Sequence, residues 1–428
     1  MQATVHVIGA GLAGLSAALR LASAGRRVVL HEGARQAGGR CRSYHDARLG
    51  CRIDNGNHLV LSGNRSTRAY LDLAGAPHAL EEAAEAAFPF IDVRSGDRWT
   101  VRINDGPIAW WPFLPSRRPP GVGLADMLGA LRILNAGAQA TIADAVRPAG
   151  PALTHFWEPM AFAVMNLPPH LASARLMAAT AIEAWRDGRL CRPMFAPQGL
   201  GPALVDPALE RLRALGAEIR FGATLRALDT LDGRVTALRF AGEGAMPLAD
   251  EDDVILAIPP ARLNAVLPEA RAPEEASSIL NAHFRLADPA VAAQAPRLMG
   301  LVNARTQWIF AKGEVLSLTI SAAEHVEGTE EAHEALLPQL WAETVAALGL
   351  PPGLQPAAAR IVHERRATFR QTPEAVARRP AALTSLANLV LAGDATDTGL
   401  PATIEGAIRS GETAARLATA RAGSGRKA

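Results

Sequence analysis

The chain has 428 residues, of which 49% are hydrophobic and 20% are charged, so it can form two domains around buried cores and is not disordered in composition. Its 44 basic and 42 acidic residues leave a formal charge of +2, which argues against nucleic-acid binding as the main task. Cys41, Cys51 and Cys191 form no CxxC pair, so we expect neither disulfides nor a metal site. Without a signal-peptide pattern or an apolar run of 18 residues, we expect a cytoplasmic protein, soluble or peripheral to the membrane.

The first 32 residues predict a strand, a glycine-rich turn, a helix and a second strand. TVHVI (4–8) is apolar and β-branched, as a buried parallel strand should be, and RRVVLHE (26–32) follows a helix that Gly25 ends. The turn between strand and helix has the pattern GxGxxG, formed by Gly9, Gly11, Leu12, Ala13 and Gly14. This order of parts predicts a dinucleotide-binding unit.

Each part of this unit has a physical role. Gly9 permits the tight turn, Gly11 lets the backbone approach a pyrophosphate, and Gly14 lets the helix pack closely on the strand. The helix N-terminus offers free N–H groups and a partial positive charge to the phosphates. Glu32, which ends the second strand, is expected to accept hydrogen bonds from ribose hydroxyls and to repel a 2′-phosphate.

A second pair of glycines follows in GGR (38–40), a feature common in flavoproteins and not needed by NAD-dependent dehydrogenases. Gly38 and Gly39 let the backbone pass near the pyrophosphate. We expect Arg40 to pair with the phosphate oxygens, because a guanidinium matches their geometry.

The stretch RIDNGNHLV (52–60) predicts a short strand and a turn. Gly56 and Asn57 are candidates to bring the backbone under an isoalloxazine ring. His58 is a candidate to lie on the face of that ring, although an ordinary histidine that is hydrogen-bonded in a turn explains it equally well.

Two later stretches of the sequence are predicted to belong to the same nucleotide-binding domain. Residues 197–230 predict a loop, a helix and two short strands that extend the first sheet and bring the backbone of Thr224 and Leu225 near the adenine. DDVILAIPPARLNAVLP (252–268) predicts another buried strand, which the two prolines end.

The last return, LANLVLAGDATDTG (386–399), predicts a strand that ends in Gly393 and Asp394, with a helix from about residue 403. Asp394 is expected to bind the ribityl hydroxyls. Backbone N–H groups of Thr403 and Ile404 would point at the N1–C2=O edge of the flavin, where negative charge collects on reduction. This segment has no cysteine, so we expect FAD to bind non-covalently.

These motifs resemble the amine oxidase and phytoene desaturase superfamily of FAD enzymes. The resemblance rests on GAGLAGLSAALRLASAG, on the GGR, on D-x-G at 54–56 and on AGDATDTGLPATIEGAIRSG. Within the superfamily, TDTGLPATIEGAIRSG and HERRATFRQTPE (363–374) are similar to the bacterial hydroxysqualene dehydroxylase branch of hopanoid pathways. The resemblance implies an α/β fold of the two-dinucleotide-binding-domain type, in which a Rossmann-like FAD-binding domain carries an inserted α+β substrate domain.

We expect the FAD-binding domain to be discontinuous, with segments 1–64, 190–268 and 380–428. Segments 65–189 and 269–379 would form the inserted domain, partly helical with a β-sheet that includes a hairpin at 306–324. Its helical part contains large apolar residues that either line a hydrophobic tunnel or form ordinary core, which is the simpler interpretation: Phe156, Trp157, Met160, Phe162, Met165, Leu176, Met177 and Trp185.

The stretch IAWWPFLPSRRPP (108–120) joins aromatic residues to two arginines. Such a composition suits a peripheral contact with the inner face of a membrane, where rings lie among headgroups and arginines on phosphates. A loop packed on its own domain is an equal alternative.

The resemblance implies that reduced FAD converts hydroxysqualene, a hydrophobic isoprenoid, to squalene. An acid must protonate the leaving hydroxyl in a dry cavity; His58 is the candidate, and a bound water or a carboxylate of the inserted domain are alternatives. The other hypotheses are a carotenoid (phytoene-type) desaturase, an amine oxidase, against which a chain with only two tyrosines argues, and a non-catalytic FAD-binding or lipid-carrier protein.

The electron donor must come from outside the chain. No second GxGxxG follows a strand, so a dedicated NAD(P)H domain is not expected, and the electrons would come from NAD(P)H at the flavin or from a partner reductase. Nothing in the sequence specifies an oligomeric state.

Overall fold

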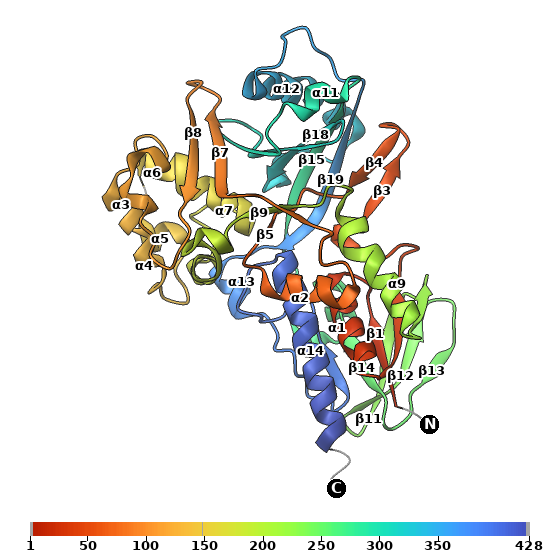
Figure 1. The fold of residues 1–428 in the computed structure, drawn as a ribbon. Coiled ribbons are helices and arrows are strands. Elements are labelled where there is room, and N and C mark those ends of the chain that lie inside the picture. Colours follow the sequence, from red (N-terminus) through yellow and green to blue (C-terminus); the bar gives the residue numbers. More distant parts are fainter. Residues whose placement is uncertain (1–2, 148, 425–428) are drawn as a thin grey trace.

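A five-stranded parallel sheet forms the centre of the nucleotide-binding region (Figure 1). The computed structural model describes residues 3–147 and 149–424; residues 1–2, 148 and 425–428 of the expected domains lie outside the described residues. The strand order is β10–β2–β1–β14–β20. The bounds are β1 Thr4–Ile8, β2 Arg27–Glu32, β10 Glu218–Phe221, β14 Asp253–Leu256 and β20 Leu389–Leu391. As predicted, separated stretches of the chain assemble one sheet.

The two faces of this sheet pack against different layers. Val5, Val7 and Ile255 belong to a core shared with four helices, and Val254 and Leu256 belong to a core shared with a three-stranded meander. The helices are α1 (Leu12–Ser23), α2 (Arg65–Ala74), α9 (Asp206–Ala214) and α14 (Ile404–Ser424), and the meander is β11 (Leu225–Leu231), β12 (Arg234–Phe240) and β13 (Ala245–Pro247). A sheet that is covered on both faces needs nearly continuous apolar strands, which explains TVHVI and DVIL.

The prediction that both strands of 218–231 extend this sheet is wrong for the second one. β10 pairs with β2, but β11 pairs antiparallel with β12 in the meander. Gly222 between them has a φ of 76°, so the chain turns there and leaves the plane of the parallel sheet.

The inserted region contains a seven-stranded mixed sheet of order β19–β15–β18–β17–β16–β7–β8. The bounds are β7 Ala86–Asp92, β8 Arg98–Ile103, β15 Ala276–Arg285, β16 Leu298–Val302, β17 Trp308–Lys312, β18 Val315–Ser321 and β19 Ala358–Phe369. The predicted hairpin is confirmed, since β17 and β18 pair across the turn at Gly313. The strands β7 and β8 come from the first inserted segment, in which the sequence analysis placed the helical part of the domain.

One face of this sheet packs on α12 (Glu330–Leu348), and another apolar core joins the sheet to the helices at the left of Figure 1. Those helices are α3 (Leu124–Leu128), α4 (Ala130–Ile133), α5 (Ile142–Val146), α6 (Gly150–Ala152), α7 (Glu158–Met165) and α8 (Ala174–Thr180). Phe156, Trp157, Met165, Leu176 and Met177 are buried in this core, so the simpler of the two interpretations holds for them.

Short elements join the two regions. β3 (Ser43–Asp46) pairs with β4 (Cys51–Asp54), and β9 (Pro193–Phe195) lies between β5 (Val60–Leu61) and β6 (Glu81–Glu82). The helix α10 (Pro260–Val266) follows β14, α11 (Pro289–Ala293) follows β15, and α13 (Pro373–Ala377) follows β19. Even the longest helices of the described residues do not have the apolar run that crossing a bilayer requires.

The helix α2 packs with the nucleotide-binding region. Tyr70 and Leu71 are buried in the same core as α1 and α14, and the Tyr70 hydroxyl donates to the Leu204 carbonyl at 2.6 Å. The expected domain boundary after residue 64 therefore separates α2 from the helices that it contacts.

Candidate active site

The turn between β1 and α1 has the geometry of a phosphate cradle. Gly9 has a φ of 102°, and a Cβ atom on Gly14 would lie 1.8 Å from the Gly9 carbonyl oxygen, so neither position accepts a side chain. A Cβ atom on Gly11 would meet no atom within 4 Å, which leaves open space beside the helix entrance. No side chain caps the N-terminus of α1, so its first N–H groups, from Leu12 and Ala13 onward, are available to an anion. These residues fit a dinucleotide.

Glu32 lies next to this cradle. Its carboxylate accepts hydrogen bonds from the backbone N–H groups of Ala10 (2.7 Å) and Ala34 (2.8 Å), which hold it at the end of β2. A carboxylate has further lone pairs, so ribose hydroxyls can still donate to it. The chain after β10 also reaches this point, because Thr224 lies against Gly33 and Leu225 begins β11. The predicted adenine end of the site is therefore assembled at one place.

The glycines of the GGR motif bring the chain back to the first glycine turn. Gly38 and Gly39 have φ angles of 102° and 54°, and a Cβ atom on Gly39 would lie 3.5 Å from the Cα atom of Gly11. The N–H of Gly38 donates to the Ala10 carbonyl at 2.8 Å. Both glycine motifs therefore line the same space.

Arg40 and Asp394 form a two-pronged ion pair between the two halves of the predicted site. The Nη1 and Nη2 atoms of Arg40 lie 2.8 and 2.6 Å from the two carboxylate oxygens of Asp394. Burial alone would raise the pKa of the Asp394 carboxyl, but the charge and hydrogen bonds of Arg40 lower it below its usual range. The sequence predicted separate partners for the two residues, phosphate and ribityl hydroxyls, and did not predict this contact.

The second helix entrance, at 393–404, is held in place by buried polar side chains. Gly393 has a φ of 130°, and its N–H donates to Ser410 Oγ at 2.7 Å. Thr403 Oγ1 accepts the N–H of Gly406 at 3.1 Å and so caps α14, which begins at Ile404. The prediction that the Thr403 N–H points at a flavin is not met here, because this N–H donates to the Pro401 carbonyl at 2.9 Å.

Two residues that the sequence analysis did not single out support this entrance. Arg379 donates to the Leu400 and Asp394 carbonyls at 2.8 and 2.9 Å, and Gln371 accepts the N–H of Ala402 at 2.8 Å. Both side chains are buried. Gln371 lies within the stretch HERRATFRQTPE, so the family pattern was the available signal.

The loop after β4 connects the nucleotide-binding region to the large sheet. A Cβ atom on Gly56 would lie 3.4 Å from both Asn281 Nδ2 and His58 Nε2. The amide of Asn57 donates to Asn281 Oδ1 at 3.3 Å and to Thr319 Oγ1 at 3.0 Å. The three predicted loop residues therefore lie against β15 and β18.

His58 is partly buried at the wall of a cavity, and this burial lowers the pKa of the imidazole below its ordinary value of 6.5. The ring is therefore mostly neutral at neutral pH. A proton donor in this position would be charged only in more acidic solution, so the candidate role of His58 as an acid can be tested by pH.

A small cavity of about 60 Å³ lies between this loop and the sheet, lined among others by Asp54, His58, His283, Lys312 and Ser317. The Asp54 carboxylate accepts hydrogen bonds from Lys312 Nζ (2.6 Å), from the Leu200 N–H (2.9 Å) and from Ser43. Its charge is thus compensated before any ligand binds. His283, Ser317, Asn281 and Thr319 were missed in the sequence, although they alternate with apolar residues along two strands.

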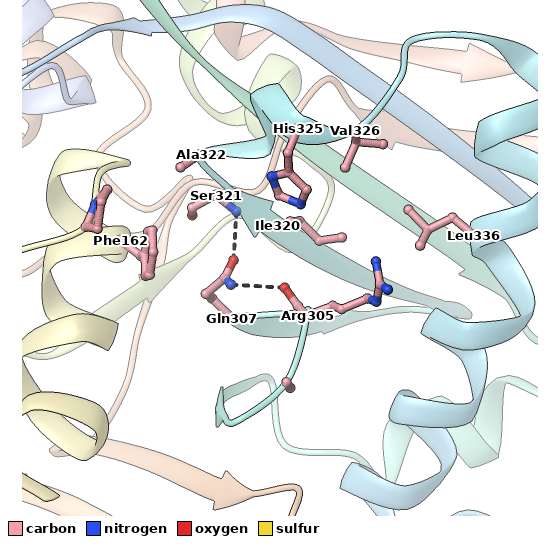
Figure 2. Close-up of a pocket in the computed structure, with 11 residues that line it drawn as sticks. Phe162, Arg305, Gln307, Ile320, Ser321, Ala322, His325, Val326 and Leu336 are labelled. Carbon is pink, nitrogen blue, oxygen red and sulfur yellow. Dashed lines mark hydrogen bonds between the residues drawn. The ribbon is translucent and has the colours of Figure 1, made fainter. Parts of the chain in front are cut away.

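A larger hollow of about 400 Å³ lies elsewhere, between α7, the end of β18 and α12 (Figure 2). Figure 2 shows Gln307 at its wall, bonded to the N–H of Ser321 at 2.7 Å and to the Arg305 carbonyl at 3.0 Å. Its lining residues belong neither to the glycine motifs nor to the loop 54–58, so it has no part in the cofactor site.

The comparisons with known proteins agree with this geometry. The model of the family "Flavin containing amine oxidoreductase" matches residues 12–419. The chain belongs to that family. The chain is 42% identical to a hydroxysqualene dehydroxylase of Rhodopseudomonas palustris over 98% of its own length and 99% of that protein's. It is 40% identical to proteins of the same name from Zymomonas mobilis and Sinorhizobium fredii, again over 97–98% of its length and 99% of theirs.

Among solved structures, wild-type putrescine oxidase bound to putrescine superimposes with a TM-score of 0.69 over 98% of this chain and 99% of that one. At 16% identity, this likeness concerns the fold. The predicted fold class is confirmed, and the protein is an FAD-dependent oxidoreductase of this family.

Proposed function

We propose that this flavoenzyme reduces hydroxysqualene to squalene in squalene and hopanoid biosynthesis. The observation that carries the proposal is the identity of 40–42% to three hydroxysqualene dehydroxylases over nearly the whole chain. The match includes the inserted region that would bind the substrate as well as the shared cofactor motifs.

The reaction is chemically balanced. Bound FAD in its reduced form supplies a hydride. The allylic C–O bond of the alcohol breaks, the hydride forms a C–H bond at the same carbon, and a proton converts the leaving hydroxyl to water. The protein must therefore deliver one proton and keep other water away from the allylic cation.

The residues beside the loop 54–58 suit these demands. The sheet face at this loop offers uncharged polar groups. Of the carboxylates beside the loop, Asp54 is paired with Lys312, and Glu364 accepts a hydrogen bond from the Asn55 amide at 2.9 Å. Beside them lie the apolar side chains of Leu200, Phe310 and Val315, which line the small cavity. A long isoprenoid chain with a single oxygen matches a surface of that kind. The proton donor is His58 in this proposal.

The electrons come from outside the chain. The sequence has no second GxGxxG motif after a strand, so we propose that NAD(P)H at the flavin or a partner reductase reduces FAD between turnovers.

The segment 108–134 is proposed to contact an anionic membrane. It contains seven exposed large apolar residues: Ile108, Trp110, Phe113, Leu114, Leu128, Leu131 and Leu134. Phe113 and Leu114 lie within the two consecutive 3₁₀ turns at 111–117, Leu128 ends α3, and Leu131 lies in α4. Ile108, Trp110 and Leu134 lie in the chain directly beside these elements. Arg117 lies over the Trp110 ring at 4.6 Å, and the segment has three arginines against one aspartate, so its charge complements lipid phosphates. A water-insoluble substrate could then enter from the bilayer.

An anaerobic single turnover tests the reaction. The FAD of the purified protein is photoreduced, hydroxysqualene is added in detergent, and the flavin spectrum is followed while the lipids are extracted. We expect reoxidation of the flavin with one squalene formed per flavin. A flavin that stays reduced would refute the dehydroxylation, and the oxidised enzyme would then be tested with phytoene-like polyenes.

Vesicle flotation tests the membrane contact. We expect the protein to float with vesicles that contain phosphatidylglycerol and to float less after Phe113→Ser with Leu114→Ser. The matched control is Leu231→Ser, which removes an apolar side chain of 65% exposure from β11. Equal flotation of the two variants would contradict the assignment of the surface.

A further inference from the structure

The face of β15 and β18 at the loop 54–58 carries buried polar side chains. Asn281 lies opposite Thr319 in the strand register, and His283 lies opposite Ser317. All four side chains are at most 6% exposed. The residues that alternate with them belong to the apolar core against α12: Leu280, Ala282, Phe284, Leu316, Leu318 and Ile320. Burying polar groups costs free energy unless they are hydrogen-bonded. These four side chains bond one another or Asn57, and the atoms of the row left without a partner among the described residues are His283 Nε2 and Asn281 Nδ2.

His283 has one ring nitrogen bound and one free. Its Nδ1 lies 2.7 Å from Ser317 Oγ. Its Nε2 is buried and has no hydrogen-bond partner in residues 3–147 and 149–424. The residue is 2% exposed and lines the cavity of about 60 Å³ together with His58. A buried nitrogen at the wall of a cavity needs a hydrogen-bond partner there, which a water molecule or a ligand supplies.

Ser317 sets the tautomer of this imidazole. In the described part of the chain, Ser317 Oγ is hydrogen-bonded to His283 alone, so its proton is best placed on that bond, toward Nδ1. The ring proton then lies on Nε2, the nitrogen at the cavity. Burial, with the charge of Lys312 acting in the same direction, lowers the pKa of His283 to about 4. The free group is thus a neutral N–H donor.

A neutral donor selects the chemistry of the ligand. Phosphates and carboxylates are held by cations or by several N–H groups. Of the three cations that line the cavity, Lys312 is bound to Asp54 at 2.6 Å, Arg297 is bound to Glu81 at 2.7 Å, and Arg52 is exposed to solvent. One uncharged N–H among the apolar side chains of Phe310, Val315 and Leu200 suits one uncharged oxygen on a hydrocarbon.

We propose that His283 Nε2–H binds the hydroxyl oxygen of the isoprenoid alcohol and that Ser317 is its positioning residue. This inference rests on the proposed function and gives it a substrate subsite. The alcohol makes this hydrogen bond and the hydrocarbon product does not. His283 therefore holds the C–O bond beside the loop 56–58 before reduction and favours release of the product afterwards.

The test compares the binding of alcohol and hydrocarbon to the oxidised holoenzyme, which cannot turn over. Hydroxysqualene and squalene are titrated in detergent while the flavin absorbance is followed, and the ratio of the two dissociation constants is measured. We expect the wild type to prefer the alcohol by about 10-fold, as a buried hydrogen bond allows. His283→Leu should bring the ratio close to one, and His283→Gln should retain part of it, because its amide N–H reaches a similar place.

Matched variants separate binding from folding. Ser277→Ala removes a buried hydroxyl from the same strand and should leave the ratio unchanged. Ser317→Ala should lower the preference by about threefold, because the tautomer is no longer set. Flavin content and thermal unfolding are measured for every variant, and where His283→Leu does not retain FAD, the ratios of Ser317→Ala and His283→Gln decide.

The inference is overturned if the wild type binds both lipids equally or if His283→Leu keeps the preference. If His283→Leu is not available as a holoenzyme, unchanged ratios in both other variants overturn it. Failure of the proposed function has a different signature: the wild type would prefer the alcohol in a His283-dependent manner and still leave the reduced flavin unoxidised in the single-turnover experiment.

Discussion

The two sheets of the molecule present different kinds of groups to the space between them. The parallel sheet presents backbone: the turn after β1, the turn at 38–40 and the entrance at 393–404 are shaped by glycines. The large mixed sheet presents side chains, namely the buried polar row of β15 and β18. A dinucleotide is bound mainly by backbone N–H groups and close approach, whereas a hydrocarbon with one oxygen is recognised by a few placed side chains. An added side-chain atom in the glycine-built site therefore blocks the dinucleotide. A substitution in the polar row of β15 and β18 leaves room for the substrate but weakens its selection.

The largest expected effect is that of Gly14→Ala. The added Cβ atom would lie 1.8 Å from the Gly9 carbonyl oxygen, so the first turn of α1 cannot stay packed on the end of β1. We expect essentially complete loss of bound FAD and a large fall in soluble yield, measured by flavin absorbance per protein. A soluble variant with a full complement of FAD would show that the backbone at this turn can shift. It would contradict the view that the glycine-built site accepts no added atom.

Asp394→Asn should have the next largest effect. It leaves the Arg40 guanidinium without its counter-charge, and because that side chain stays 38% exposed, we expect a loss of about 3 kcal/mol in the free energy of unfolding, at the low end for a broken buried pair. Urea unfolding of the apoprotein at pH 7 measures it, because in the holoenzyme the expected contact of Arg40 with the phosphates would supply another counter-charge. The control is Asp397→Asn, at an exposed position three residues away.

The pH dependence of this loss has a definite sign. The pKa of Asp394 is lower in the folded chain than its ordinary 3.8, so the ion pair contributes fully above that value and loses its contribution as the pH falls through the folded pKa. The difference between wild type and Asp394→Asn should therefore be constant from pH 7 to 5 and shrink in more acidic solution. A difference that grew with acidity would contradict the pairing.

Gly11→Ala isolates cofactor binding from folding. Its Cβ atom meets no protein atom within 4 Å, and its φ of −74° is open to alanine, so the free energy of unfolding of the apoprotein should change by less than about 1 kcal/mol. The same atom would occupy the space of the pyrophosphate, and we expect the affinity for FAD to fall by about 30-fold. Titration of apoprotein with FAD measures it. Unchanged affinity would place the phosphates elsewhere.

The contrast between the sheets also explains what could be predicted from sequence. Gly9, Gly11, Gly14 and Gly393 were recognisable because backbone recognition requires glycine at fixed spacings next to a strand end. The parallel strands were recognisable because burial on both faces makes them continuously apolar. The departure of β11 from the parallel sheet was not recognisable, because it depends on one turn at Gly222 and on the antiparallel pairing of β11 with β12.

The side-chain contacts of the site were harder to predict than its glycine turns. Arg40 and Asp394 meet across 354 positions of sequence, and no local pattern indicates that pairing. Asn281 and His283 do have a local signal, because polar residues alternate with apolar ones in SSILNAHFR, as they do in VLSLTIS. Alternation normally indicates a solvent-exposed face. That this face is buried against the loop 54–58 follows only from the tertiary structure.

The smallest expected effect concerns His58, which lies where the two kinds of site meet. If it is the proton donor, its charged form must be present, and because burial lowers its pKa below 6.5, that form increases as the pH falls toward the lowered value. We therefore expect the rate of flavin reoxidation by hydroxysqualene to rise by at most about 10-fold per pH unit between pH 8 and 6.5. His58→Gln should be slower and independent of pH, while His45→Gln, at an exposed position in β3, should behave as the wild type. If the rate of the wild type did not change with pH, another group would donate the proton, and His58 would be a neutral residue beside the glycine-built cofactor site.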